Sequence, residues 1–311
     1  MKKALITGGA GTLGSSLAKM LLKKDYEVHV YDVRQIDEAP KLKPVINRVK
    51  YHWKAVHDIT EDDLEGVELV AHCAAQPDRP LGIASPIYTL DMNIMGLASV
   101  LEASRCCETL KKFLFPGSGT IFSGVPYDQL PVTEDSIPQP TNPYSASKYM
   151  GEILCDTYRR CYGIPTVILR SGLVYGEGMR LDISIAQFII KALQDKEFMV
   201  RSPHATRTPS HIDDVLLFWN AVIDLEPGLV VGKVFHSVYG KEYSIIDIAR
   251  TVTKVVGKGL ARPSKEYEDG EFGAREWTTT TKQDELQVYC KVDLEEGIRR
   301  TIQYIKEAVE L

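Results

Sequence analysis

The segment from Ala4 to Leu17 constrains the fold of this chain more than any other stretch of its sequence. It passes from a short apolar run through closely spaced glycines into a helical pattern. Glycines at these spacings let the backbone turn sharply and approach a pyrophosphate, while the helix that follows begins with free N–H groups. The segment therefore predicts a strand–loop–helix unit that binds a dinucleotide. Its expected contacts are Gly8, Gly11, Thr12, Leu13 and Gly14.

Short β-branched runs alternate with helical periods up to about residue 171, which is typical of parallel strands joined by crossover helices. Strands are expected at residues 4–7, 28–32, 49–53, 68–73, 112–118 and 166–171. Beyond residue 176 the pattern predicts helices at 182–193, 215–223, 245–256 and 294–308, a strand at 234–238, and loops at 201–210 and 258–275. The predicted fold class is α/β, a Rossmann-type doubly wound parallel sheet with a smaller C-terminal substrate-binding lobe. Residues 1–171 would form the cofactor domain, 212–240 would return to it, and 172–311 would mainly form the lobe.

Acidic and small residues follow the next three expected strands. Asp32 ends the second strand, where its carboxylate can accept hydrogen bonds from both hydroxyls of a cofactor ribose and would repel a 2′-phosphate. This predicts NAD as the cofactor, although Arg34 is close enough to favour a 2′-phosphate. Asp58 and Ile59 would contact an adenine, and Ala74 leaves room for close approach of the cofactor. A solvated loop and ordinary packing explain these three residues nearly as well.

Three residues indicate proton transfer at the same edge of the sheet. Asn142 and Pro143 begin a helix on which Tyr144 and Lys148 lie one turn apart. A lysine cation and an oxidised nicotinamide would lower the pKa of the phenol enough for it to act as a base. Ser118 ends the expected fifth strand and can donate to the reacting oxygen. Together they predict an enzyme that moves a proton and a hydride on an alcohol, rather than a surface tyrosine and a turn serine.

Composition excludes several other classes of protein. The net charge of −5 is spread over mixed acidic and basic residues without a basic block, so we expect no nucleic-acid or membrane partner. The N-terminal apolar run is too short for a signal peptide or a membrane span. Six cysteines without Cys-x-x-Cys spacing predict reduced thiols, no metal site and a cytoplasmic location.

Along nearly its whole length the chain resembles the extended short-chain dehydrogenase/reductases, in particular the NAD-dependent nucleotide-sugar epimerase/dehydratase family. Besides the motifs above, the resemblance rests on His72-Cys-Ala-Ala, Asn93-Ile-Met-Gly, Leu169-Arg170 followed by Tyr175-Gly176, and Arg207 followed by His211-Ile-Asp-Asp. It implies Tyr144 as base, Lys148 on the nicotinamide ribose, Ser118 on the reacting hydroxyl and Asn93 as a structural and cofactor-side contact. It also implies Arg207 on a substrate diphosphate, where an exposed ion pair is the alternative, and pairing of two copies into a homodimer.

The residues after Ser118 distinguish reactions within the family. Dehydratases that resemble this chain carry an Asp-Glu pair there, whereas Gly119 and Thr120 are similar to the pattern of 4-epimerases. The resemblance therefore implies epimerisation of a nucleotide sugar at C4, with Thr120 and Leu173 among the substrate contacts. Two departures make the substrate pocket atypical: Ser171-Gly-Leu173 stands where the family has an Asn, and residues 202–205 lack the usual glycine. A net NAD-dependent dehydrogenase or reductase and a non-catalytic NAD-binding regulatory protein are the alternatives.

Overall fold

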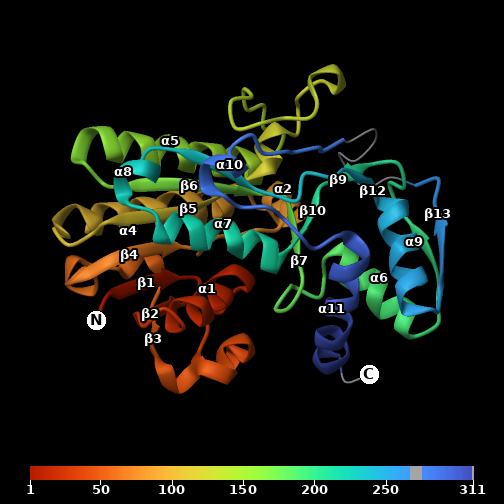
Figure 1. Ribbon diagram of the computed structural model, residues 1–311, viewed down its shortest axis with the longest axis horizontal. Coiled ribbons are helices and arrows are strands. Elements are labelled where there is room, and N and C mark those ends of the chain that lie inside the picture. Colours follow the sequence, from red (N-terminus) through yellow and green to blue (C-terminus); the bar gives the residue numbers. More distant parts are fainter. Residues whose placement is uncertain (267–274, 310–311) are drawn as a thin grey trace. The chain divides into compact units, whose positions relative to one another are not determined.

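The computed structural model describes residues 1–266 and 275–309, and the chain divides into two compact units (Figure 1). The first unit contains Met1–Ile121, Pro138–Arg170 and Asn220–Phe235. The second contains Phe122–Ile137, Ser171–Trp219 and His236–Leu311. Residues 122–137 thus join the second unit, whereas the predicted division placed them in the first. The functions predicted for the two parts stay predictions.

A seven-stranded sheet forms the centre of the first unit, in the order β11-β6-β5-β4-β1-β2-β3. Its strands are β1 (Lys3–Thr7), β2 (Glu27–Asp32), β3 (Val49–Trp53), β4 (Val67–His72), β5 (Lys112–Ser118), β6 (Thr166–Ser171) and β11 (Val234–Ser237). β1 pairs in parallel with both β2 and β4, and the pairs β2–β3 and β4–β5 are also parallel. The predicted Rossmann-type α/β fold is confirmed. Strand order reverses between β1 and β4, which is where such sheets bind ligands.

Helices pack on both faces of this sheet. The helices of this unit are α1 (Thr12–Leu22), α2 (Arg79–Ala84), α3 (Pro86–Leu90), α4 (Gly96–Ala103), α5 (Pro143–Tyr162) and α8 (Pro227–Val230), whereas α7 (Ile212–Asp224) has residues 212–219 in the second unit and 220–224 in the first. Leu5, Val70 and Phe113 point to one face of the sheet, where they share a core with Leu97 and Val100 of α4. Side chains alternate along each strand, so α1 covers the opposite face over β1 and β2. Burial of each large apolar side chain contributes about 1.5–3 kcal/mol.

Helix α5 has clear sequence signals at both ends. Asn142 accepts a hydrogen bond from the backbone N–H of Ser145 at 3.0 Å, and Pro143 follows in the first turn, where it needs no N–H partner. Gly163 ends the helix with a φ of 74°, which a glycine adopts without strain. These caps fix the start of the helix, and therefore the positions of the residues in its first turns.

The second unit has a core of its own between α6 (Ser184–Leu193), α9 (Ile245–Val256) and α11 (Leu294–Ala308). Its other elements are β7 (Leu173–Tyr175), β8 (Glu197–Val200), β9 (Thr206–Arg207), β10 (Pro209–His211), β12 (Tyr243–Ser244), β13 (Leu260–Pro263) and α10 (Gln283–Leu286). The predicted loop at 201–210 is confirmed for residues 201–205, but β9 and β10 pair with β12 and β7 in its second half. β13 interrupts the predicted loop at 258–275, and residues 267–274 of that loop lie outside the described residues.

Two further observations concern the class of protein. No helix within residues 1–266 and 275–309 is long and apolar enough to cross a membrane. All six cysteines are free thiols. The cytoplasmic location expected from the sequence stays a prediction.

Candidate active and cofactor site

The glycine loop joins β1 to α1 and closes tightly against the end of β4. Gly8 has a φ of 64°, and its N–H donates to the Tyr31 carbonyl at 2.8 Å. A Cβ atom on Gly8 would lie 2.6 Å from the backbone nitrogen of Ala74, and one on Gly14 would lie 2.5 Å from the Gly8 carbonyl oxygen. Helix α1 then begins at Thr12 with Gly11 as an N-cap that has no side-chain cap. Side chains are thus excluded from a cradle whose helix N-terminus suits a pyrophosphate.

Asp32 is held in place by backbone N–H groups of the glycine loop and of the turn after β2. Its Oδ2 accepts from the N–H of Ala10 at 2.9 Å, and its Oδ1 accepts from the N–H of Arg34 at 3.0 Å. The carboxylate is buried at the end of β2 but keeps lone pairs for further donors, as a ribose contact requires. Lys41 donates to Thr12 Oγ1 at 3.3 Å. This cation beside the loop could not be predicted from the sequence, because 29 residues separate the two partners.

Asn93 clamps the loop after β4 to helix α5. Its Oδ1 accepts from the N–H of Gln76 at 2.7 Å, while its Nδ2 donates to the Gln76 carbonyl at 3.1 Å and to Ser147 Oγ at 2.8 Å. All of these groups are buried. Among the described residues, the buried Gln76 Oε1 has no hydrogen-bond partner. A buried oxygen without a partner, two residues after Ala74, could accept a hydrogen bond from a bound molecule.

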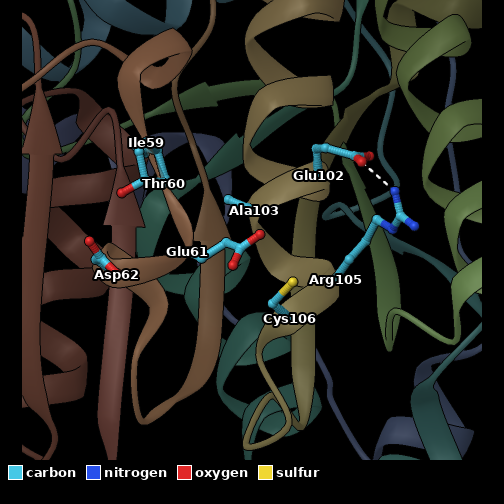
Figure 2. Close-up of a pocket in the computed structure, with 8 residues that line it drawn as sticks. All are labelled: Ile59, Thr60, Glu61, Asp62, Glu102, Ala103, Arg105 and Cys106. Carbon is cyan, nitrogen blue, oxygen red and sulfur yellow. Dashed lines mark hydrogen bonds and ion pairs between the residues drawn. The ribbon is translucent and has the colours of Figure 1, made fainter.

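Asp58 and Ile59 lie after β3, as predicted, but in different surroundings. Asp58 is exposed, whereas Ile59 is buried and lines a hollow of about 710 Å³. Figure 2 shows that hollow, with the ion pair between Arg105 and Glu102 on one side of it. Its lining residues are Ile59, Thr60, Glu61, Asp62, Glu102, Ala103, Arg105 and Cys106. The hollow contains none of the predicted proton-transfer residues, and adenine contacts of Asp58 and Ile59 stay predictions.

Helix α5 runs along β5 and brings Lys148, one of the predicted proton-transfer residues, to the segment that ends at Ser118. Lys148 is buried and its Nζ donates to the Pro116 carbonyl at 3.1 Å, two residues before Ser118 on the same strand. The Nζ also lies 5.0 Å from the centre of the Phe115 ring. Ser118 Oγ lies 2.9 Å from Thr120 Oγ1, so the two hydroxyls form one hydrogen-bonded pair. Tyr144 begins the same helix one turn before Lys148 and lies beside Gly82 of α2.

Burial changes the proton affinity of the groups around Lys148. It lowers the pKa of Lys148 to about 8, while Cys73 and Glu152 act in the opposite direction. Burial, together with the charge of Lys148, lowers the pKa of His72 to about 3. Burial raises the pKa of the Cys73 thiol to about 12. At neutral pH His72 and Cys73 are therefore uncharged, and Lys148 is the cation among these three groups.

The remaining predicted substrate contacts, Leu173 and Arg207, belong to the second unit. Leu173 begins β7 and pairs with Pro209 of β10. Arg207 lies in β9, where its Nη1 donates to the Thr206 carbonyl at 2.7 Å and its Nε lies 3.7 Å from Glu276 Oε2. Both substrate roles stay predictions. Within the described residues no group of three His, Cys, Asp or Glu side chains is arranged to hold a metal ion.

Comparison with known proteins identifies the family of this chain. The model of the NAD-dependent epimerase/dehydratase family matches residues 4–229. A putative UDP-glucose 4-epimerase of Methanocaldococcus jannaschii is 30% identical over 97% of this chain and 98% of its own. A trifunctional Arabidopsis thaliana enzyme, whose activities include UDP-glucose 4,6-dehydratase, is 26% identical over 99% of this chain and 48% of its own. The crystal structure of UDP-glucuronic acid 4-epimerase from Bacillus cereus with UDP-glucuronic acid and NAD is 27% identical, covers 98% of this chain and 99% of that one, and has a TM-score of 0.88.

The chain therefore belongs to the NAD-dependent epimerase/dehydratase family, within the extended short-chain dehydrogenase/reductases. The prediction of NAD as cofactor is confirmed. The glycine cradle, the buried Asp32 and the orphaned Gln76 acceptor fit that cofactor. The relatives named above include both epimerases and a dehydratase, so family membership does not distinguish between the two reactions.

Proposed function

We propose that the protein epimerises a nucleotide sugar at C4 through a transient keto sugar, with Tyr144 as the base. The observation that carries this proposal is the hydroxyl pair of Ser118 and Thr120 at the end of β5. Elimination of water from a sugar needs an acid and a base at that position, and hydroxyl groups of ordinary pKa do not supply them. The Methanocaldococcus jannaschii and Bacillus cereus relatives, both named as 4-epimerases, support the same reaction.

Each residue of the set has a defined task in this proposal. Bound NAD supplies a hydride acceptor that becomes a hydride donor in the second half of the reaction. Tyr144 takes the proton of the C4 hydroxyl and returns it after the keto sugar has rotated to present its other face. Ser118, oriented by Thr120, donates a hydrogen bond to the reacting oxygen. Lys148, anchored on the Pro116 carbonyl, holds the cofactor ribose and places positive charge near the phenolate.

The test is incubation of the protein, as purified, with UDP-glucose, UDP-N-acetylglucosamine, UDP-glucuronic acid and dTDP-glucose. We expect one of them to convert to its C4 epimer without added NAD and without a net change in the absorbance of reduced cofactor. Accumulation of reduced cofactor in proportion to product would establish a dehydrogenase instead. A stable 4-keto-6-deoxy product would establish a dehydratase, and binding of NAD without turnover of any sugar would favour a regulatory protein.

The affinity for NAD is expected to fall as the pH rises through about 8. Below this pH Lys148 carries its charge, and above it the neutral amine can make only weaker hydrogen bonds to the ribose. Loss of a charge-assisted bond of about 1–1.5 kcal/mol predicts a Kd about fivefold to tenfold higher at pH 9.5 than at pH 7. Calorimetric titration with NAD measures this change, and Lys148→Met should remove the dependence. A Kd that does not vary with pH in the wild type would contradict the role given to Lys148.

We also propose that two copies pair through the outer side of α5 and its neighbours. Met150 and Ile153, one turn apart on α5, are exposed, as are Ile83 of α2 and Ile87 of α3, and both of these short helices pack on α5. A row of exposed apolar side chains on adjoining helices is rare on monomers. A second copy of the same surface is the occupant that the family resemblance favours.

Ile153→Lys is expected to convert a dimer into a monomer at micromolar concentration. The substitution would place two ammonium groups near the centre of a symmetric interface, which costs several kcal/mol. Sedimentation velocity measures the mass, and Met199→Lys is the control because Met199 is equally exposed on β8 of the second unit. A monomeric wild type at this concentration would refute the proposed pairing.

A further inference from the structure

A buried ion pair lies one turn beyond Lys148. Arg170 Nε donates to Glu152 Oε1 at 3.0 Å and to Oε2 at 3.2 Å, and its Nη2 donates to Oε2 at 2.8 Å. Both side chains are about 95% buried, with exposed fractions of 6% for Arg170 and 5% for Glu152. Two charges at this depth lose their hydration, and such a pair often adds little to stability over a pair of apolar residues of the same size. A contribution to the stability of the fold therefore does not by itself explain why a charged pair is found here.

The position of Glu152 on its helix connects it to the proton-transfer residues. Tyr144, Lys148 and Glu152 follow one another at intervals of four residues on α5. Residues at this spacing lie on one face of a helix, so the carboxylate is the next group along from the ammonium. Arg170 reaches Glu152 from the end of β6.

The ion pair also touches the strand that carries the other half of the site. A Cβ atom on Gly117 would lie 2.7 Å from Glu152 Oε1 and 2.8 Å from Arg170 Cγ, so this glycine lets the pair pack directly on β5. Gly117 lies between Pro116, whose carbonyl accepts from Lys148, and Ser118. The pair therefore supports the three residues that orient both the ammonium and the catalytic hydroxyl.

Glu152 also bears on the charge of Lys148. Burial raises the pKa of Glu152, and the hydrogen bonds and charge of Arg170 and the charge of Lys148 offset only part of this rise. The charge of Glu152 in turn raises the pKa of Lys148, so the carboxylate favours the charged ammonium. If Glu152 were uncharged, Lys148 would lose this support, while Arg170 would keep its own charge in the same buried region. The titratable groups that act on Lys148 or respond to it are His72, Cys73, Glu152 and Cys155.

We propose that Glu152, held by Arg170, is a positioning residue of the active site that acts through Lys148 and the β5 segment 116–118. This inference rests on the proposed role of Lys148 in that site. Neither member of the pair touches substrate or cofactor in this proposal. Their task is to keep a buried ammonium charged and oriented next to Tyr144, at a depth where an unpaired cation would lose its proton.

The test is a titration of the Lys148 ε-amine by NMR with ¹³C-labelled lysine, assigned with Lys148→Met. In Glu152→Gln the ammonium is expected to lose its proton about one pH unit lower than in the wild type, because the carboxylate that favours its charge is gone. In Arg170→Gln the carboxylate is released toward Lys148, so the proton should be lost at higher pH. The double variant Glu152→Gln/Arg170→Met removes both charges and should titrate between Glu152→Gln and the wild type.

Opposite shifts in the two single variants, with partial recovery in the double variant, are the signature of an electrostatic role. A merely structural pair would lower the melting temperature in all three variants and leave the Lys148 titration unchanged, and that result would overturn the proposal. Should Glu152→Gln not fold, the upward shift in Arg170→Gln and its loss in the double variant still decide the matter. The titration needs no substrate, so it is independent of whether the sugar panel reveals an epimerase.

Discussion

Tyr144→Phe is expected to lower kcat by about 10²- to 10⁴-fold while leaving NAD bound, because it removes one hydroxyl and keeps the ring. The helix cap at Asn142 and the anchored Lys148 do not depend on that hydroxyl, so the fold and the cofactor site should persist. Turnover of the sugar identified by the panel, together with the NAD content of the purified variant, measures both effects.

Tyr149→Phe is the matched control, because it makes the same chemical change five residues further along α5. Five residues correspond to about 140° of rotation around a helix, so Tyr149 does not share the face of Tyr144 and Lys148. Its kcat should stay within about twofold of the wild type. Wild-type turnover by Tyr144→Phe would remove the base from the mechanism, whatever the reaction proves to be.

The sheet of the first unit could be predicted from the sequence because its signals are local. Expected strands at residues 49–53, 112–118 and 166–171 agree with β3, β5 and β6 at both ends, and the expected helices at 245–256 and 294–308 agree with α9 and α11. These segments combine apolar periodicity with turn or cap residues. Strands β9 and β10 were missed because they are two and three residues long and polar. Such short segments cannot show the alternation of apolar and polar residues that identifies a strand.

The parts of the site that escaped prediction are contacts between distant residues. Asn93 joins Gln76 to Ser147, Lys41 reaches Thr12, and Arg170 binds Glu152 across 18 residues. Each partner is an ordinary polar residue in its own segment, and only the packing of these segments in the folded chain brings the partners together. Tyr144, Lys148 and Ser118 could be proposed from the sequence, because a phenol, an ammonium and a hydroxyl have recognisable spacing. Of the groups that surround them, Asn93 was expected, but its partners were not.

Gly8→Ala is expected to lower the affinity for NAD by about 10²-fold or more and to destabilise the fold. The φ of 64° costs about 1–3 kcal/mol for a residue with a Cβ. The new methyl group would lie 2.6 Å from the Ala74 nitrogen and 2.7 Å from the Cys73 carbonyl carbon, so the loop must move away from β4. A displacement of this loop would open the cradle proposed to bind the pyrophosphate, and 2.7 kcal/mol of lost binding corresponds to about 10²-fold in Kd.

Gly228→Ala provides the control for this loop substitution, since a Cβ on Gly228 meets no atom within 4 Å and its φ is not positive. Its melting temperature and Kd should match the wild type, with a change in the free energy of unfolding within about 0.5 kcal/mol. Thermal unfolding with and without NAD separates the two effects of Gly8→Ala, because strain lowers the melting temperature of both forms and loss of binding removes the increase that NAD produces. If NAD still raised the melting temperature of Gly8→Ala as much as that of the wild type, the cofactor would not depend on this closure between the loop and β4. The pyrophosphate would then have to be held from the side of Lys41 and Thr12 instead.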